Sequence, residues 1–233
     1  MSEQKMIHTM EELSRALREG ASEDYRAFFL PLIPAVDPGR VLGVSLPALD
    51  EIIKRMSPEF TRTFLDSSSL PHGTHEEDLL HMRLLRREGD FAAIVANLKY
   101  FLPHVDSWAV TDTPLPKVFR EHRRELWPTT VDWLGAQGAY TRRYALYLLK
   151  SLYLDQEYGK LTIQIVGAFR DPRYYVAMMQ AWFFQEAFLH FEEESFAVYG
   201  QLPEEVQRMT RRKVLDSKKS SPQLKSKLRR PKS

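Results

Sequence analysis

Residues 139–154 have the sequence AYTRRYALYLLKSLYL, in which apolar side chains recur at helical spacing on more than one face. Residues 178–196 show the same pattern. A helix that is apolar on two sides lies inside a stack of helices rather than on the surface of a bundle. Both stretches therefore predict helices that pack against neighbours on two sides.

Helix signals continue in both directions along the chain. Thr9-Met10-Glu11-Glu12 is a capping box, and Ser22 and Ser57-Pro58 are typical helix starts. We place Tyr25, Phe28, Phe29 and Leu32 on one face of the helix that Ser22 begins. Prolines separate the expected segments of the second half at positions 103, 114, 128 and 172. These segments are residues 105–111, 115–126, 131–134, 140–154, 159–169 and 174–199.

Neither an Asn-Gly nor an Asp-Gly hairpin signal is present, and no segment alternates convincingly with the period of a strand. Paired short helices at a period of roughly 35 to 45 residues favour a solenoid of stacked helix pairs. A compact, irregular helical domain is the alternative. We predict an all-α fold, with a single repeat domain over residues 1–215 and a basic tail over residues 216–233.

The charge is unevenly distributed. Residues 208–233 carry eleven Lys/Arg and one acid, a net charge of +10, whereas the preceding residues carry −8. A basic segment on an acidic body is suited to polyanions, and a solvated, frayed tail is the alternative.

Several classes of function lack support. The chain has no Cys, which excludes disulfides, thiolate metal sites and a cysteine nucleophile. No apolar run approaches the roughly 20 residues of a membrane span, and the first five residues have no apolar signal core. No glycine-rich phosphate loop is present. We expect a cytoplasmic monomer without membrane contact, metal or cofactor.

Trp108 and Asp112 stand four residues apart, so a helix would place both on one face. An aromatic plane beside a carboxylate suits a cationic or cation-forming substrate. The alternative is a core Trp108 and an Asp112 that caps a helix end before Pro114.

Four segments resemble the DNA alkylation repair (AlkD-like) family of HEAT-repeat glycosylases, in family order. Trp108-Ala-Val-Thr-Asp112 is similar to the Trp-x-x-x-Asp segment of these enzymes. The stretch from Tyr140 to Leu149 resembles the segment with a catalytic-cleft arginine, which Arg143 matches best. The stretch from Tyr175 to Trp182 resembles the helix with a second cleft tryptophan. The stretch from Arg40 to Leu49 resembles the opening of the second repeat. The active enzymes have a further aromatic residue near the N-terminus, and Tyr25 is the candidate for that residue here.

This resemblance implies a HEAT-like α-α superhelix of stacked antiparallel helix pairs with a concave DNA-binding surface. It also implies a glycosylase that acts on cationic alkylated purines along that surface, with the lesion still largely stacked. Asp112 would stabilise the sugar cation and orient water, and Trp108 and Trp182 would pack against the deoxyribose. Arg143 would grip a flanking phosphate. Duplex DNA is the expected partner, through its backbone phosphates. The expected phosphate contacts are Arg142, Arg211, Arg212, Lys213, Lys218 and Lys219.

Two other functions stay open: a non-catalytic binder of damaged or branched DNA on the same fold, and a HEAT-like protein scaffold. Other polar or aromatic groups receive structural interpretations. We expect Glu192-Glu193-Glu194 to form a solvated helix face and His104 to lie at the surface. Trp127 and Trp133 should anchor core packing. His75-Glu76-Glu77-Asp78 lacks the second His of a zinc helix.

Overall fold

The computed structural model describes residues 5–66, 68 and 70–229. These residues form α-helices and short 3-10 turns without a strand, and their extended pairing is limited to the isolated bridges Ile7–Met56 and Ala21–Val44. The predicted all-α class is therefore confirmed. Contacts divide the chain into two compact units, unit 1 (Met1–His122) and unit 2 (Arg123–Ser233). The single domain over residues 1–215 stays a prediction.

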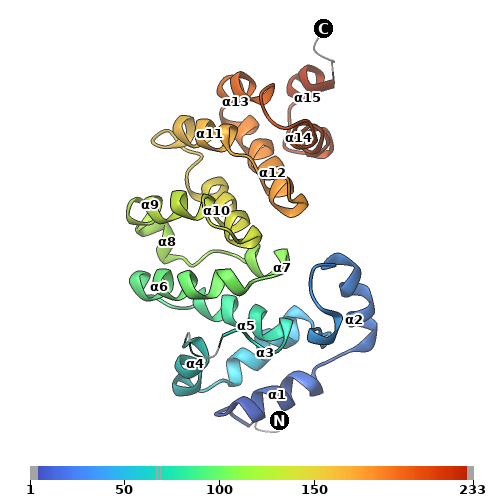
Figure 1. Ribbon diagram of the computed structural model, residues 1–233, viewed down its shortest axis with the longest axis vertical. Coiled ribbons are helices and arrows are strands. Elements are labelled where there is room, and N and C mark those ends of the chain that lie inside the picture. Colours follow the sequence, from blue (N-terminus) through green and yellow to red (C-terminus); the bar gives the residue numbers. More distant parts are fainter. Residues whose placement is uncertain (1–4, 67, 69, 230–233) are drawn as a thin grey trace. The chain divides into compact units, whose positions relative to one another are not determined.

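Unit 1 begins most of its helices at side-chain caps. Thr9, Ser22 and Ser57 each accept a hydrogen bond from the backbone N–H three residues later, as expected of an N-cap. Helices α1, α3, α5 and α7 contact one another in succession, and α4 packs against α5 (Figure 1). The helices are α1 (Met10–Glu19), α2 (Glu23–Phe29), α3 (Leu46–Arg55), α4 (Pro58–Leu65), α5 (His75–Leu85), α6 (Phe91–Phe101), α7 (Trp108–Thr111) and α8 (Val118–Glu121), with 3-10 turns η1 (Leu30–Leu32), η2 (Pro38–Arg40) and η4 (Leu102–His104).

Unit 2 consists of helix pairs in two layers. One layer contains α10, α12 and α14, in which α12 packs against both others, and in the second layer α11 packs against α13 (Figure 1). Stacked pairs of this kind are the unit of a helical repeat. The helices are α9 (Arg123–Leu134), α10 (Ala139–Leu152), α11 (Gly159–Ala168), α12 (Tyr174–His190), α13 (Glu192–Tyr199), α14 (Glu204–Asp216) and α15 (Pro222–Arg229).

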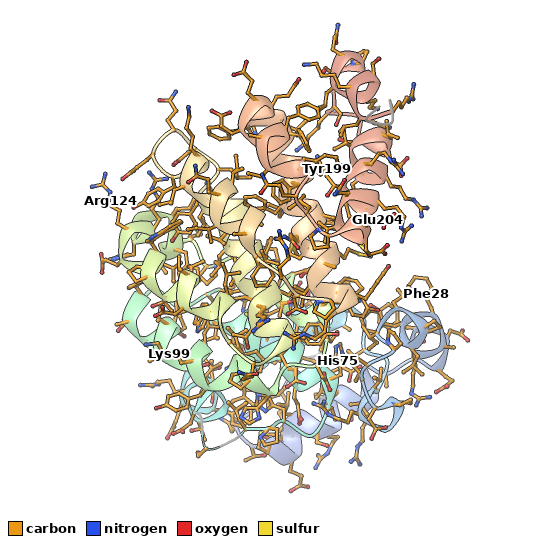
Figure 2. All side chains as sticks on the ribbon, turned by 45° about the horizontal axis from the view of Figure 1, so that its top comes forward. Phe28, His75, Lys99, Arg124, Tyr199 and Glu204 are labelled. Carbon is orange, nitrogen blue, oxygen red and sulfur yellow. The ribbon has the colours of Figure 1, made fainter. Side chains whose placement is uncertain are left out.

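The two stretches that predicted helices packed on both sides lie mainly in α10 and α12. Both helices are buried along most of their length, including Tyr144, Leu146 and Leu149 of α10 and Phe183 and Phe184 of α12. Tyr199 and Glu204, labelled in Figure 2, mark the end of α13 and the start of α14. No helix within the described residues is long and apolar enough to cross a membrane.

Three local expectations were wrong. The segment expected over residues 174–199 is divided at Phe191 into α12 and α13. Pro128 does not separate two segments, because α9 continues through it. The buried side chains of Leu126 and Trp133 hold both halves of α9 in place, so tertiary packing offsets the single backbone hydrogen bond that proline removes. Phe28 and Leu32 do not share a packed face with Tyr25 and Phe29. Phe28 is 67% exposed, at the outer edge of α2 (Figure 2), and Leu32 lies in η1, outside the register of the helix.

Candidate active site

Trp108 and Asp112 lie on a single helical turn of unit 1. Ser107 caps α7 by accepting a hydrogen bond from the Ala109 N–H at 3.1 Å. The Asp112 N–H donates to the Trp108 carbonyl at 2.9 Å, which closes the turn. Asp112 is the C-cap of α7, as the alternative interpretation stated, and it is also one turn from Trp108, as the spacing predicted.

The indole of Trp108 is held in a fixed position. Its Nε1–H donates to the Leu32 carbonyl at 2.7 Å. The half-buried ring packs against the buried cluster of Ile33, Val36 and Val41, where Phe29 also packs. A tryptophan with a satisfied N–H and one packed face presents a rigid aromatic surface. Trp108 is thus anchored to the segment that follows α2 without being enclosed in the core.

The carboxylate of Asp112 is half-buried at the end of the same turn. Thr111 Oγ1 donates a hydrogen bond to its Oδ1 at 3.2 Å. The hydrogen bond from the Asp112 N–H to Trp108 fixes the backbone of Asp112, and the hydrogen bond from Thr111 orients its carboxylate. Partial burial strengthens the interaction of a carboxylate with a nearby positive charge, because less water screens it.

Tyr25, the candidate for a further aromatic, belongs to the same part of unit 1. Its ring stacks on Phe29 with centroids 5.7 Å apart and an interplanar angle of 11°. Phe29 packs on the cluster that also holds Trp108. Burial raises the pKa of the Tyr25 phenol, and Glu76 raises it further. The role of Tyr25 toward DNA stays a prediction.

Arg40 anchors the segment before α7, a role that the sequence analysis did not assign. Its guanidinium pairs with Asp106 at 2.5 Å and with Asp78 at 2.7 Å, and donates to the His72 carbonyl at 3.3 Å. Asp106 lies just before the cap of α7, so Arg40 connects that turn to the start of α5. Burial raises the pKa of Asp78 to about 7 although Arg40 opposes this shift.

Glu76 anchors a second loop in unit 1. Its buried carboxylate accepts hydrogen bonds from the backbone N–H groups of Leu42, Gly43 and Val44 at 2.7 to 3.2 Å. Gly43 has a φ of +89°, and a Cβ there would approach the Ser22 carbonyl to 2.5 Å. The feature of the sequence that could have revealed this role is the run of four polar residues at the start of α5. Acidic side chains require hydrogen-bond partners when they are buried.

Arg143 connects two helices of unit 2. It is 2% exposed, and its Nη1 donates to the Tyr175 carbonyl at the start of α12. This hydrogen bond joins the middle of α10 to the helix that bears Trp182. A grip of Arg143 on a phosphate stays a prediction.

Trp182 is exposed, and two lysines flank it. The indole is 40% exposed. Lys213 Nζ of α14 lies 4.4 Å from the ring centroid, and Lys150 Nζ of α10 lies 5.8 Å from it. These are cation–π distances, which stabilise a cation beside the ring. Unit 2 therefore combines an aromatic plane with positive charge.

Arg142, the neighbour of Arg143, is bound within unit 2. It pairs with Asp171 at 3.0 Å and donates to the Ala136 carbonyl at 2.5 Å. The 1% exposed Asp171 carboxylate also pairs with Arg173. Burial raises the pKa of Asp171, but its hydrogen bonds to Arg173 and Arg142 outweigh this effect and lower it. Arg142 thereby joins α10 to the loop before α12, and its phosphate contact stays a prediction.

The predicted phosphate contacts near the C-terminus lie on and after α14. Arg211 and Arg212 are exposed on the helix, and Lys218 and Lys219 are exposed between α14 and α15. The chain then forms α15, which buries Leu224 and Leu228 and packs against α14. Lys227 of α15 pairs with Glu192 of α13. Much of the basic segment is thus helical and packed within unit 2.

The structural interpretations of the other residues are confirmed. Glu192 and Glu194 begin α13 at the surface, where they pair with Lys227 and Lys160. Trp127 packs against Tyr153, and the 8% exposed Trp133 packs against Tyr144. His104 is exposed.

The four proposed catalytic residues thus form two pairs, Trp108 with Asp112 in unit 1 and Arg143 with Trp182 in unit 2. Their convergence on one concave surface stays a prediction.

Among curated proteins and solved structures, none matches the chain. A sequence model of the family described as "DNA alkylation repair enzyme" matches residues 9–187, which span both pairs. The chain therefore belongs to the DNA alkylation repair family, which indicates a role in DNA repair with DNA as the partner.

Proposed function

We propose that this protein is a DNA glycosylase that hydrolyses the N-glycosidic bond of cationic alkylated purines, of the 3-methyladenine and 7-methylguanine type, in duplex DNA. The observation that carries the proposal is the α7 turn, in which a half-buried carboxylate lies one turn from an anchored indole. Family membership supplies DNA repair as the context.

The chemistry follows from charge. Alkylation at a ring nitrogen makes the purine cationic and weakens its bond to deoxyribose. As this bond breaks, its electron pair moves to the base, which leaves as a neutral molecule, and the sugar develops oxocarbenium character. The Asp112 carboxylate would stabilise this positive charge and orient the water that adds to C1′ and gives up a proton. A well-placed electrostatic contact of this kind contributes on the order of 10²–10³ in rate.

The two tryptophans would hold the sugar. Trp108 cannot rotate freely, because its Nε1–H is bound to Leu32 and one face packs on Ile33, Val36 and Val41. A rigid aromatic plane against the deoxyribose excludes bulk water from the reacting carbon. Trp182 would contribute the second plane, and Arg143, which ties α10 to the start of the Trp182 helix, would contact a flanking phosphate.

The experiment is base release from alkylated duplex DNA by wild type and by Asp112→Asn, with spontaneous depurination subtracted. Asn keeps the size of Asp and removes the charge, so we expect release to fall to background. DNA affinity should stay similar or rise, because a carboxylate repels phosphates. Asp132→Asn, which changes an exposed aspartate of α9, is the matched control and should release base at the wild-type rate.

Two outcomes would contradict the proposal in different ways. Equal release by wild type and Asp112→Asn would remove Asp112 from the mechanism. No release by wild type with intact DNA binding would favour a non-catalytic binder of damaged or branched DNA.

A further inference from the structure

Lys213 is a half-buried cation of unit 2, and several other cations of that unit are ion-paired. Arg142 and Arg173 share Asp171, Lys160 pairs with Glu194, and Lys227 pairs with Glu192. The side-chain ammonium of Lys213 makes neither a salt bridge nor a hydrogen bond to any residue that the structure describes, whereas its backbone carbonyl accepts from the Ser217 N–H. The carboxylate nearest along its own helix, Asp216, lies 3.8 Å from Arg212 instead.

The surroundings of Lys213 are positive and aromatic. Its Nζ lies 4.4 Å from the centroid of the exposed Trp182 indole, and Lys150 approaches the same ring at 5.8 Å. Arg143 of α10 and Arg212 of α14 both repel a positive charge at this position. The Lys213 ammonium thus lies beside an exposed aromatic ring and near two cations that repel it.

We propose that Lys213 and Trp182 form a nucleotide-binding subsite in which the ammonium holds a backbone phosphate and the indole packs against the adjoining sugar. The subsite rests on the proposed function, since it assigns part of the DNA contact. A DNA strand alternates phosphates with flat or apolar groups, and an indole flanked by lysines presents the complementary pair. An acidic peptide would satisfy the lysines but would leave the exposed ring without a matching surface.

A proton should be taken up when the subsite is filled. Burial lowers the pKa of Lys213 to about 8, and Arg143 and Arg212 lower it while Asp216 raises it. From the neighbouring elements, Arg143 of α10 acts on Lys213, and Lys150 of α10 lies 5.8 Å from the centroid of the same Trp182 ring. A phosphate in contact with the ammonium would raise this pKa, so free protein near pH 8 must gain a proton on binding. Because only the protonated amine holds the phosphate, DNA affinity should fall about tenfold between pH 7 and pH 9.

The test measures binding of an unmodified 20-base-pair duplex at pH 7 and pH 9, and at several salt concentrations. Lys213→Met keeps the length of the aliphatic chain and removes the charge. We expect its affinity at pH 7 to fall about tenfold and its salt slope to flatten by about 0.9, the value for one lost phosphate contact. Lys213→Arg keeps the charge at both pH values, so it should bind at pH 7 and lose most of the pH dependence.

The matched control is Lys99→Met, which removes an exposed lysine of α6 in unit 1 (Figure 2). Calorimetry in two buffers of different ionisation enthalpy should show proton uptake near pH 8 for wild type and none for Lys213→Arg. Circular dichroism of each variant establishes that a lost affinity does not reflect unfolding.

The results separate the subsite from the proposed function. Equal affinity and salt slope of Lys213→Met and Lys99→Met, with wild type binding DNA, would overturn the subsite and leave the glycosylase proposal intact. Tighter, Lys213-dependent binding of polyglutamate than of DNA would overturn it in favour of an acidic protein partner. Absence of DNA binding by wild type at pH 7 would contradict both the subsite and the glycosylase proposal. Wild type that binds DNA but releases no base would contradict only the glycosylase proposal.

Discussion

Helix α5 of unit 1 and helix α12 of unit 2 have comparable neighbours, because each packs against the helix before and the helix after it in one layer. Their buried side chains differ in kind. The first turn of α5 buries His75, Glu76, Glu77 and Asp78. Among the buried residues of α12, by contrast, Gln180 is the one polar side chain, and it donates to the Val166 carbonyl at 2.8 Å.

The difference shows two ways of holding in place the residues that we propose contact DNA. Unit 1 holds its loops and the turn before Trp108 with buried charges, through Glu76 and the Asp78–Arg40–Asp106 network. In unit 2 apolar packing dominates α12, and the buried Asp171 with Arg142 and Arg173 joins α10 to the loop before α12. We therefore expect charge changes at Glu76 to affect stability, and charge changes at the lysines beside the exposed Trp182 to affect ligand binding.

The largest expected effect is that of Glu76→Ala. Three backbone N–H groups of the loop at Gly43 would lose a charged acceptor inside the protein, which should lower the free energy of unfolding by about 3–5 kcal/mol. Urea unfolding measures the loss, and hydrogen exchange should localise it to unit 1. Glu51→Ala, at an exposed position of α3, should cost less than about 0.5 kcal/mol. Equal losses in the two variants would contradict the anchoring role of Glu76.

Mild acid should destabilise unit 1 selectively. Burial, the main cause in each, lowers the pKa of His72 to about 3 and those of His75 and His81 to about 4. These histidines stay neutral in the folded protein but take up protons when it unfolds. Their contribution to the free energy of unfolding is therefore fully present above pH 6.5 and is lost as the pH falls toward 4. Asp78, with its pKa raised to about 7, acts in the opposite direction over the same range.

Between pH 7 and pH 5, each of the three histidines should lower the free energy of unfolding by about 2 kcal/mol, and Asp78 should raise it by about 2 kcal/mol. The net loss is therefore about 3–4 kcal/mol. Urea unfolding at the two pH values measures the sum, and hydrogen exchange assigns it to a unit. Unit 2 is the internal control, because the histidine that the structure describes there, His190, is exposed. Equal acid sensitivity of the two units would refute this prediction.

The smallest effect should come from Lys227→Met in α15. Its ion pair with Glu192 and its contact with the Phe196 ring, 5.9 Å away, are at the surface of unit 2. Exposed pairs contribute little because water and salt screen them, so we expect a loss below about 1 kcal/mol. Thermal unfolding in low and high salt tests this. A loss above about 2 kcal/mol would mean that a surface charge supports unit 2, which would weaken the contrast between the units.

The local features of the fold could be predicted from the sequence. Caps at Thr9, Ser22 and Ser57 were predicted from residue type, because a hydroxyl that accepts a nearby backbone N–H acts within one turn. The spacing of Trp108 and Asp112 likewise placed both on one turn, since helical geometry relates residues four apart. Pro128 shows the limit, because the packing of α9 outweighed a strong local signal.

The contacts that position the site depended on tertiary structure. Arg40 meets Asp78 and Asp106 across 38 and 66 residues, and nothing local in the chain relates these positions. The unpaired state of Lys213 beside Trp182 likewise arises only where α14 packs on α12. By itself the sequence determined the helical class, the helix starts and the Trp108–Asp112 turn, because short-range hydrogen bonding and periodicity decide them. Only the packed chain decided which charges are buried, paired or exposed, because burial and electrostatic partners depend on residues distant in sequence.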